Sequence, residues 1–270
     1  MTKRTLLRPT ALVDAPFGFD GQVARLAGGL CFFSAVELIT VDGKRRTSCD
    51  LVPVGEIEAR LDDDSSAQWA ALTSPRQPLE LGTRTVRLDE PQVMGILNVT
   101  PDSFSDGGRF ADVEEAIAAG VDMAMAGAAI IDVGGESTRP GSTMVWEGDE
   151  IERVVPVIQR LAAGGTAVSA DTRKAAVMKA AIDAGAGMIN DVSALTWDDQ
   201  SATVLAASTV PVILMHHQGD PATMQDDPRY DDVLVEVYLW LEERISAAVA
   251  AGIARERILV DPGFGFCNAG

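Results

Sequence analysis

The sequence predicts an α/β protein: an incomplete (β/α)8 barrel with a small N-terminal α+β appendage. Beyond residue 91, short apolar runs alternate with runs of helical spacing, and each apolar run ends in a polar or acidic residue. No glycine-rich phosphate-binding loop follows the first apolar run, although a doubly wound open sheet would require one there. Uniformly apolar runs also favour parallel strands, because these are buried on both faces.

About six βα units are expected. The apolar runs that are typical of short buried strands are residues 93–99, 129–133, 167–169, 188–190, 211–215 and 258–260. Helical spacing predicts helices over residues 112–126, 149–161, 172–184, 201–207 and 230–251. Asp112 is a suitable N-cap for the first of these helices, with Glu114 and Glu115 in its first turn.

The barrel domain is expected to span residues 91–270 and to lack its last two βα units, because a complete barrel needs roughly 250 residues. Missing units would expose strand edges and apolar core. We therefore expect the 270-residue chain to be unstable or weakly active beside one that is longer by about 80 residues.

Residues 1–90 form the expected appendage. Residues 30–40 and 45–54 are strand-like, and the Asp42-Gly43 pair between them predicts a hairpin turn. A helix is expected over residues 54–61, and a polar break over residues 62–66. No catalytic set of residues is visible in this segment, and its role does not follow from the sequence.

Composition narrows the class of protein. The chain has 22 Lys and Arg against 40 Asp and Glu, a net charge of −18, which argues against nucleic-acid binding. The mean hydropathy of +0.11 suits a buried core, and no apolar run approaches the length of a membrane span. The three cysteines form no pair spaced for zinc, and the basic N-terminus lacks the apolar core of a signal peptide. We therefore expect a cytoplasmic protein.

Polar side chains follow each predicted strand at its carboxyl end. The chemically informative ones are Asn98, Asp132, Asp171, Asn190, His216 and Asp261. In a parallel barrel the carboxyl ends of the strands meet at one face, which is where barrel enzymes carry their active sites. Buried acids and amides are costly unless a ligand or a polar network satisfies them, so a binding pocket is expected at this face.

Six successive segments resemble the motifs of the dihydropteroate synthase family. They are VMGILNVTPDSFSDGG, IIDVGGESTRPG, SADTRK, GMINDVSAL, VILMHHQGDPATMQ and ILVDPGFGF, and together they extend over residues 91–266. The resemblance implies a TIM barrel that condenses 6-hydroxymethyl-7,8-dihydropterin diphosphate with 4-aminobenzoate. The products would be 7,8-dihydropteroate and diphosphate, in folate biosynthesis. It also implies Mg²⁺ as cofactor and a homodimer for the full-length protein.

The resemblance assigns the pterin ring to four side chains. Asp261 would accept two adjacent N–H donors of the ring, and Asn190 would offer a donor and an acceptor to its mixed edge. Asp171 would act catalytically, by contacting the ring and stabilising positive charge as the bond to diphosphate breaks. Met215 would pack on the ring face. The alternative for these polar residues is an internal network without a ligand.

The remaining roles concern the diphosphate and 4-aminobenzoate. Asn98 would ligate Mg²⁺, Thr138 and Arg139 would lie near both substrates as catalytic residues, Phe266 would form an apolar wall, and His216 would contact the diphosphate. Four of these residues, all except Thr138, have a structural alternative. The alternatives are a turn-forming Asn, a salt bridge of Arg139 to Glu136 or Asp132, a core Phe and a structural His.

The implied mechanism is a dissociative substitution without a covalent enzyme intermediate. The family motif normally continues with a Lys after the final glycine, whereas Cys267 and Asn268 follow Phe266 here, and basic residues from two later strands are absent. Two alternatives stay open, the first because related domains share the barrel and some strand-end acids, and the second because of these missing residues. One is a pterin-binding methyltransferase domain, and the other is an inactive remnant that binds pterin without turnover.

Overall fold

The computed structural model describes residues 3–100, 109–136, 144–219 and 229–264. The chain divides into two compact units. The first comprises Met1–Pro78, Arg87–Pro91 and Tyr230–Glu236, and the second comprises Leu79–Val86, Gln92–Arg229 and Val237–Gly270. No helix in the described ranges is long and apolar enough to cross a membrane.

The first unit contains an antiparallel sheet in which β3 (Phe32–Asp42) pairs with β1 (Arg4–Val13), β2 (Ala24–Arg25) and β4 (Arg45–Pro53). The predicted hairpin is confirmed: β3 and β4 join through Gly43, whose φ of 63° favours glycine. The strand β1 was not expected. Buried side chains of β3, including Phe33 and Val36, form the core with Leu7, Val52 and Ile57.

The predicted helix over residues 54–61 is a 3-10 helix, η2 (Val54–Arg60), and a shorter one, η1, covers Leu26–Gly28. The polar break predicted over residues 62–66, after η2, is wrong, because the α-helix α1 (Asp63–Thr73) begins there. Asp62 is its N-cap: the carboxylate accepts from the Ser65 N–H at 2.8 Å, and the Ser65 hydroxyl accepts from the Asp62 N–H at 2.8 Å. The acidic run is therefore a helix start and not a linker.

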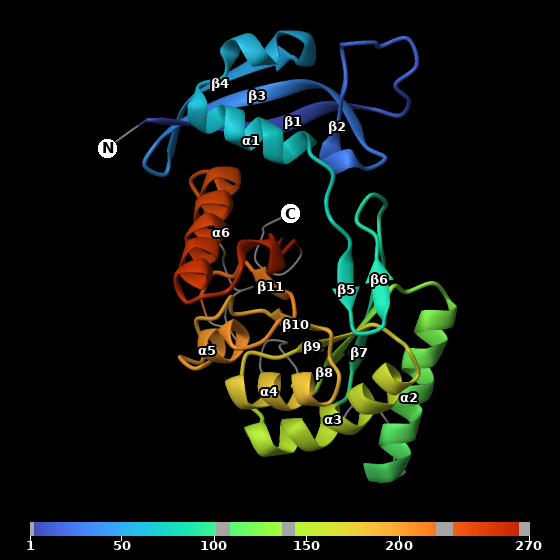
Figure 1. Cartoon of the computed structure of the whole chain (residues 1–270). Helices are drawn as coiled ribbons and strands as arrows, with labels where there is room; N and C mark the ends of the chain where they lie inside the picture. The colour runs from blue at the N-terminus through green and yellow to red at the C-terminus, as the bar shows by residue number, and fades with distance from the viewer. Residues whose placement is uncertain (1–2, 101–108, 137–143, 220–228, 265–270) are drawn as a thin grey trace. The chain divides into compact units, whose positions relative to one another are not determined.

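The second unit is built on six parallel strands, in agreement with the predicted incomplete barrel. They are β7 (Met94–Asn98), β8 (Ile130–Gly134), β9 (Val168–Asp171), β10 (Met188–Asp191), β11 (Val212–Met215) and β12 (Ile258–Asp261). Each strand pairs with the next along the chain, in the order β12-β11-β10-β9-β8-β7 (Figure 1). A doubly wound sheet reverses its strand order at a switch point, whereas a barrel does not. The sheet is not closed within the described residues, since β7 and β12 are its two edges.

Helices connect these strands close to the predicted positions. They are α2 (Arg109–Met125), α3 (Glu147–Ala163), α4 (Ala175–Asp183), α5 (Ser201–Ala206) and α6 (Val233–Ala250), with a 3-10 turn η3 (Arg255–Arg257) before the last strand. The predicted cap at Asp112 is wrong, because α2 already begins at Arg109 and includes Asp112. The acidic residues at 112, 114 and 115 therefore lie within the first two turns of an established helix.

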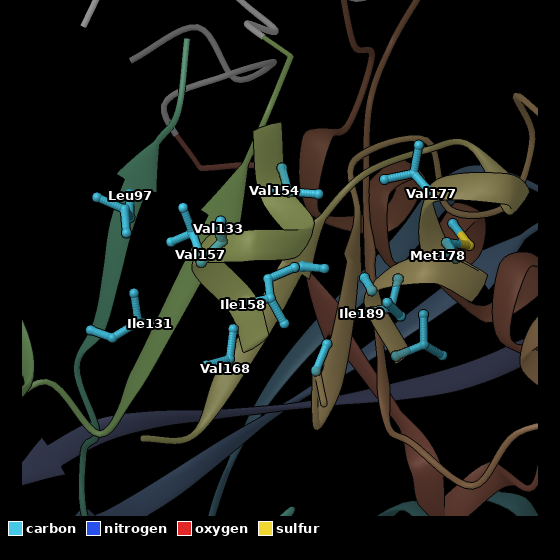
Figure 2. Packing of buried hydrophobic residues seen from close by; sticks show 14 of the residues in the cluster. Leu97, Ile131, Val133, Val154, Val157, Ile158, Val168, Val177, Met178 and Ile189 are labelled. Carbon is cyan, nitrogen blue, oxygen red and sulfur yellow. The ribbon is translucent and has the colours of Figure 1, made fainter. Parts of the chain in front are cut away.

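One face of the parallel sheet packs against these helices. Its buried side chains alternate along each strand, as a period of two requires, and include Leu97, Ile131, Val133, Val168, Ala170, Ile189, Val212 and Leu214. Figure 2 shows Val133, Val168 and Ile189 among Val154, Val157 and Ile158 of α3 and Met178 of α4. This cluster is the main hydrophobic core, and it leaves the opposite face of the strands available for other chemistry.

A short hairpin, β5 (Leu79–Leu81) and β6 (Arg84–Val86), lies at the amino ends of the parallel strands. Gly187, just before β10, lies so close that an added Cβ would be 3.0 Å from the Leu81 backbone. Arg84 Nε also donates to the carbonyl of Gly165, before β9, at 2.7 Å. These residues fall in the segment that the sequence assigns to the appendage, yet they pack with the sheet and cover its amino ends.

Candidate functional site

A row of four residues crosses four neighbouring strands at their carboxyl ends, and the three polar members, Asn98, Asp171 and Asn190, are called the polar row below. In the strand register, Asn98 of β7 lies opposite Gly134 of β8, Gly134 opposite Asp171 of β9, and Asp171 opposite Asn190 of β10. Paired residues on adjacent strands project from the same face of a sheet. The structure therefore brings three of the predicted site residues, Asn98, Asp171 and Asn190, to one face.

Two further predicted residues project from this same face. Asn190 pairs with Ile213, and Met215 lies two residues beyond Ile213 on β11. Met215 in turn pairs with Asp261 of β12. Because successive side chains alternate between faces, Met215 and Asp261 share the face of the polar row. Met215 is buried and Asp261 is half-buried.

Gly134 allows the polar row to converge. A Cβ at this position would lie 3.3 Å from Oδ2 of Asp171 and 3.6 Å from Oδ1 of Asn98. The carboxylate and the amide oxygen therefore both approach the space above this glycine. Two oxygen ligands from β7 and β9, the strands on either side of β8, suit a hard cation such as Mg²⁺. No cluster of three or more His, Cys, Asp or Glu side chains that could hold a metal exists in the described ranges.

Asp132 lies one step deeper on the same face, and the sequence analysis gave it no role in binding the pterin. It is 4% exposed, and its Oδ2 accepts from Nδ2 of Asn190 at 2.8 Å. Its register partner is Ser169 of β9. Within the described residues, neither Oδ1 of Asp132 nor the Ser169 hydroxyl has a hydrogen-bond partner. Sequence reasoning missed this pairing because it depends on the register of β8, β9 and β10.

Burial and crowding of carboxylates raise two pKa values at this face. Burial raises the pKa of Asp132, and the nearby Ser169 hydroxyl and the Asn190 amide oppose the rise. Burial also raises the pKa of Asp171 well above the usual aspartate range, and the negative charges of Asp132, Asp191 and Glu150 add to it. The face thus holds acids that are poorly stabilised as anions, which is typical of functional sites.

The neighbouring Asp191 contrasts with Asp171. It is fully buried, and its carboxylate accepts from the backbone N–H and hydroxyl of Ser193 at 2.8 and 2.6 Å and from the Leu195 N–H at 2.9 Å. These bonds shape the turn after β10, where Ala194 and Leu195 have positive φ angles. Asp191 therefore stabilises a turn and faces away from the polar row.

Asp261 has one oxygen already engaged. Its Oδ1 accepts from the Gly263 N–H at 2.8 Å, which folds the chain back after β12. Gly263 has φ of 70°, and an added Cβ would collide with the carbonyl oxygen of His216. The turn therefore requires glycine, and it fixes the carboxylate of Asp261 at the end of the strand.

His216 follows Met215 but packs toward the helices. Its ring is buried and meets the ring of Trp240 in α6 edge-on, with centroids 4.9 Å apart. Burial lowers the pKa of His216, and the nearby His217 lowers it further. A buried, aromatic-packed imidazole supports the structural alternative for His216, so its role in diphosphate binding stays a prediction.

A buried charged network lies beside the polar row and was not expected. Lys174 contacts the carboxylates of Glu150 and Glu136 and donates to the carbonyl of Val145 at 2.7 Å. Arg173 donates to both oxygens of Glu136 at 3.2 and 3.3 Å and stacks over the Trp197 ring at 3.7 Å. Burial opposes ionisation of Glu136, but the Val145 N–H and the two cations together lower its pKa. The described partners of Glu136 are thus Arg173, Lys174 and the backbone N–H of Val145.

A pocket of about 410 Å³ adjoins this network. Its lining comprises Met144, Val145, Trp146, Glu147, Lys174, Trp197, Asp198 and Asp199. None of the polar-row residues lines it, so we place the candidate site at the polar row, where the acids have raised pKa values. Thr138, Arg139 and Phe266 lie outside the described residues.

The comparisons with known proteins define the class. Residues 94–270 match the family model for pterin binding enzymes, and the chain belongs to this family. It is similar to the dihydropteroate synthase of Escherichia coli (strain K12), with 49% identity over 181 residues that cover 66% of this chain and 64% of that protein. The dihydropteroate synthase of Neisseria meningitidis (serogroup B, strain MC58) is 44% identical over 194 residues, covering 70% of this chain and 67% of the relative.

Solved structures agree with this assignment and with the predicted resemblance. The dihydropteroate synthase of Xanthomonas albilineans with 4-aminobenzoic acid superimposes with a TM-score of 0.66 at 51% identity, covering 72% of this chain and 69% of that chain. The Burkholderia cenocepacia enzyme complexed with 7,8-dihydropteroate superimposes with a TM-score of 0.63 at 38% identity, covering 72% and 66%. The chain spans about 64% of the length of the Escherichia coli relative.

Proposed function

We propose that this chain carries the pterin-binding part of a dihydropteroate synthase. The reaction joins 6-hydroxymethyl-7,8-dihydropterin diphosphate to 4-aminobenzoate and releases diphosphate. The observation that carries the proposal is the polar row: Asn98, Asp171 and Asn190 share one face of the sheet, with Met215 and Asp261 beside them. Relatives at 49% and 44% identity bear the same name, and related structures hold 4-aminobenzoic acid or 7,8-dihydropteroate.

In this proposal the ring of the pterin lies over the polar face. Asn190 and Asp261 bind its donor and acceptor edge, and Met215 packs on the ring. Asp171 is the catalytic residue. Its anion is destabilised by burial and by neighbouring carboxylates, so a positive charge that develops on the pterin relieves that repulsion. Because the relief is greatest when the charge is greatest, it favours the transition state over the ground state.

The bond between the pterin methylene and the diphosphate oxygen breaks, and the electron pair leaves with diphosphate. The amine of 4-aminobenzoate then attacks the methylene and loses a proton. We propose Asn98 as a ligand for Mg²⁺, whose chemistry when bound is to neutralise the departing diphosphate. Thr138, Arg139 and Phe266 remain proposed substrate contacts, as does His216. The homodimer and the cytoplasmic location also remain predictions.

Two measurements test the proposal. Isothermal titration of the 270-residue chain with the pterin diphosphate should show binding that strengthens with Mg²⁺, and addition of 4-aminobenzoate should yield 7,8-dihydropteroate. Asp171→Asn should retain the fold and lose most turnover. Pterin binding without any product would favour a non-catalytic pterin-binding protein, and binding indifferent to both Mg²⁺ and diphosphate would favour a methyltransferase-type domain.

A further inference from the structure

The deepest acid of the polar face, Asp132, has no part in the reaction proposed above. It is almost completely buried, and its described hydrogen bond joins Oδ2 to Nδ2 of Asn190. Burying a carboxylate on a strand is costly, and an apolar residue would pack there at lower cost. Because this acid lies directly beneath the Asn190 amide, which is proposed to bind the ring, we expect it to have a function at that amide.

The side-chain amide of Asn190 has two possible orientations that differ in which atom, O or N, faces Asp132. An ionised carboxylate only accepts hydrogen bonds, so the nitrogen must face Asp132. The 2.8 Å contact is consistent with this orientation. The carbonyl oxygen and the second N–H of Asn190 are then directed away from Asp132 in a fixed order.

We propose that Asp132 is a positioning residue that fixes the Asn190 amide so that it presents its acceptor and its remaining donor to the pterin ring in one order. The inference rests on the proposed function, since it concerns the same site. Ser169 of β9 lies beside Asp132, because the two residues are paired in the strand register. An amide at position 132 would remove the constraint, since it donates as well as accepts and would let Asn190 adopt either orientation.

A double-mutant cycle tests whether Asp132 acts through Asn190. The variants are Asp132→Asn, Asn190→Ala and the double variant, each titrated with the pterin diphosphate. We expect Asp132→Asn to weaken binding by about tenfold, which is the worth of one well-placed hydrogen bond. In the Asn190→Ala background, the same substitution should change the affinity by less than about twofold, because nothing remains to be positioned.

Kinetics separate positioning from a general loss of structure. For Asp132→Asn the KM for the pterin diphosphate should rise, while the KM for 4-aminobenzoate should stay within about twofold of its original value. Asp191→Asn is the matched control, since Asp191 is also a buried acid near Asp171 but faces the turn after β10. It should leave the pterin KM within about twofold. Unchanged pterin affinity in Asp132→Asn, or equal losses in both backgrounds, would overturn the inference.

A measurement on the ligand-free protein distinguishes this inference from the proposed function. In side-chain amide NMR spectra, one Asn190 proton should be shifted downfield and exchange slowly, and Asp132→Ala should abolish both properties. A pterin that fails to bind the unmodified chain would refute the proposed function, and the inference would fall with it. Pterin binding by a chain whose Asn190 amide shows no protected proton would refute the inference alone.

Discussion

The two faces of the parallel sheet have opposite chemistry although the same strands supply both. The face toward the helices is filled by aliphatic side chains, such as Val133, Ala170 and Ile189, which are buried almost completely. The other face carries Asn98, Asp132, Asp171 and Asn190 at the same strand ends, with raised pKa values at both acids. Burial of the first face stabilises the fold. The polar groups of the second face lower stability, and a bound ligand can offset that loss by satisfying them.

A period of two along each strand makes this division possible. Every second residue belongs to one face, so a strand of four or five residues contributes to both the core and the site. Substitutions on the two faces should therefore differ in sign as well as in size. Four predictions examine this contrast, beginning with the largest expected effect.

Lys174→Met tests the charged network that lies beside the faces. Removing the ammonium leaves Glu150, which is fully buried, and Glu136 short of a cation, and we expect the free energy of unfolding to fall by about 3–5 kcal/mol. Urea denaturation measures this loss. Lys179→Met is the control, because its ion pair with Asp183 is exposed and should contribute less than about 0.5 kcal/mol. Similar losses for both variants would contradict the assignment of a buried network.

Ile189→Ala and Ile96→Ala compare the faces directly. Ile189 is 0% exposed on the helix side, and its truncation should lower the free energy of unfolding by about 3 kcal/mol. Ile96 belongs to the other face and is 65% exposed, so its truncation should cost less than about 0.5 kcal/mol. Urea denaturation curves of the two variants measure the two losses, and equal losses in the free energy of unfolding would show that both faces are packed.

Asp171→Asn should stabilise the protein while it removes the catalysis proposed above. Because the folded pKa of Asp171 lies above its unfolded value, the folded chain retains a proton that the unfolded chain has lost. Stability therefore declines as the pH rises above roughly 4, and the amide avoids that decline. At neutral pH we expect a gain of about 1 kcal/mol that disappears near pH 4. Melting curves across this range test it, and a variant that is less stable at every pH would refute the crowding of acids.

His216→Phe should produce the smallest change in the free energy of unfolding. Burial lowers the pKa of the His216 imidazole in the folded chain. In the unfolded chain the imidazole has its ordinary pKa of about 6.5, so it takes up a proton at a higher pH than in the folded chain. The original chain should lose stability between pH 7 and 5 by less than about 1 kcal/mol, and Phe should reduce this loss while keeping the edge contact with Trp240. An identical pH profile for both proteins would show that His216 does not contribute to it.

Much of the second unit could be predicted from local patterns. Apolar runs marked the six strands to within two residues, and their polar ends marked Asn98, Asp171, Asn190 and Asp261. The bond between Asp132 and Asn190 could not be predicted, because it depends on register between strands 58 residues apart. The contact of Lys174 with Glu150 joins the start of α4 to α3 and depends in the same way on packing.

In the first unit a local signal was present but was misinterpreted. The run Asp62-Asp63-Asp64-Ser65 has the composition of a linker and also of a helix N-terminus, and Ser65 at the third helical position distinguishes them. Strand β1 was missed because Arg8 and Pro9 interrupt its apolar pattern, and its pairing with β3 compensates for that interruption.

Gly134 has a consequence for how this family tolerates mutation. Its φ angle is not among those that favour glycine, so alanine would suit its backbone. The methyl group would nevertheless press on the Asp171 carboxylate from 3.3 Å and separate it from Asn98. Under the proposed function, a saturation screen that scores cellular abundance and pterin binding separately should find that alanine at this position leaves abundance unchanged and weakens pterin binding.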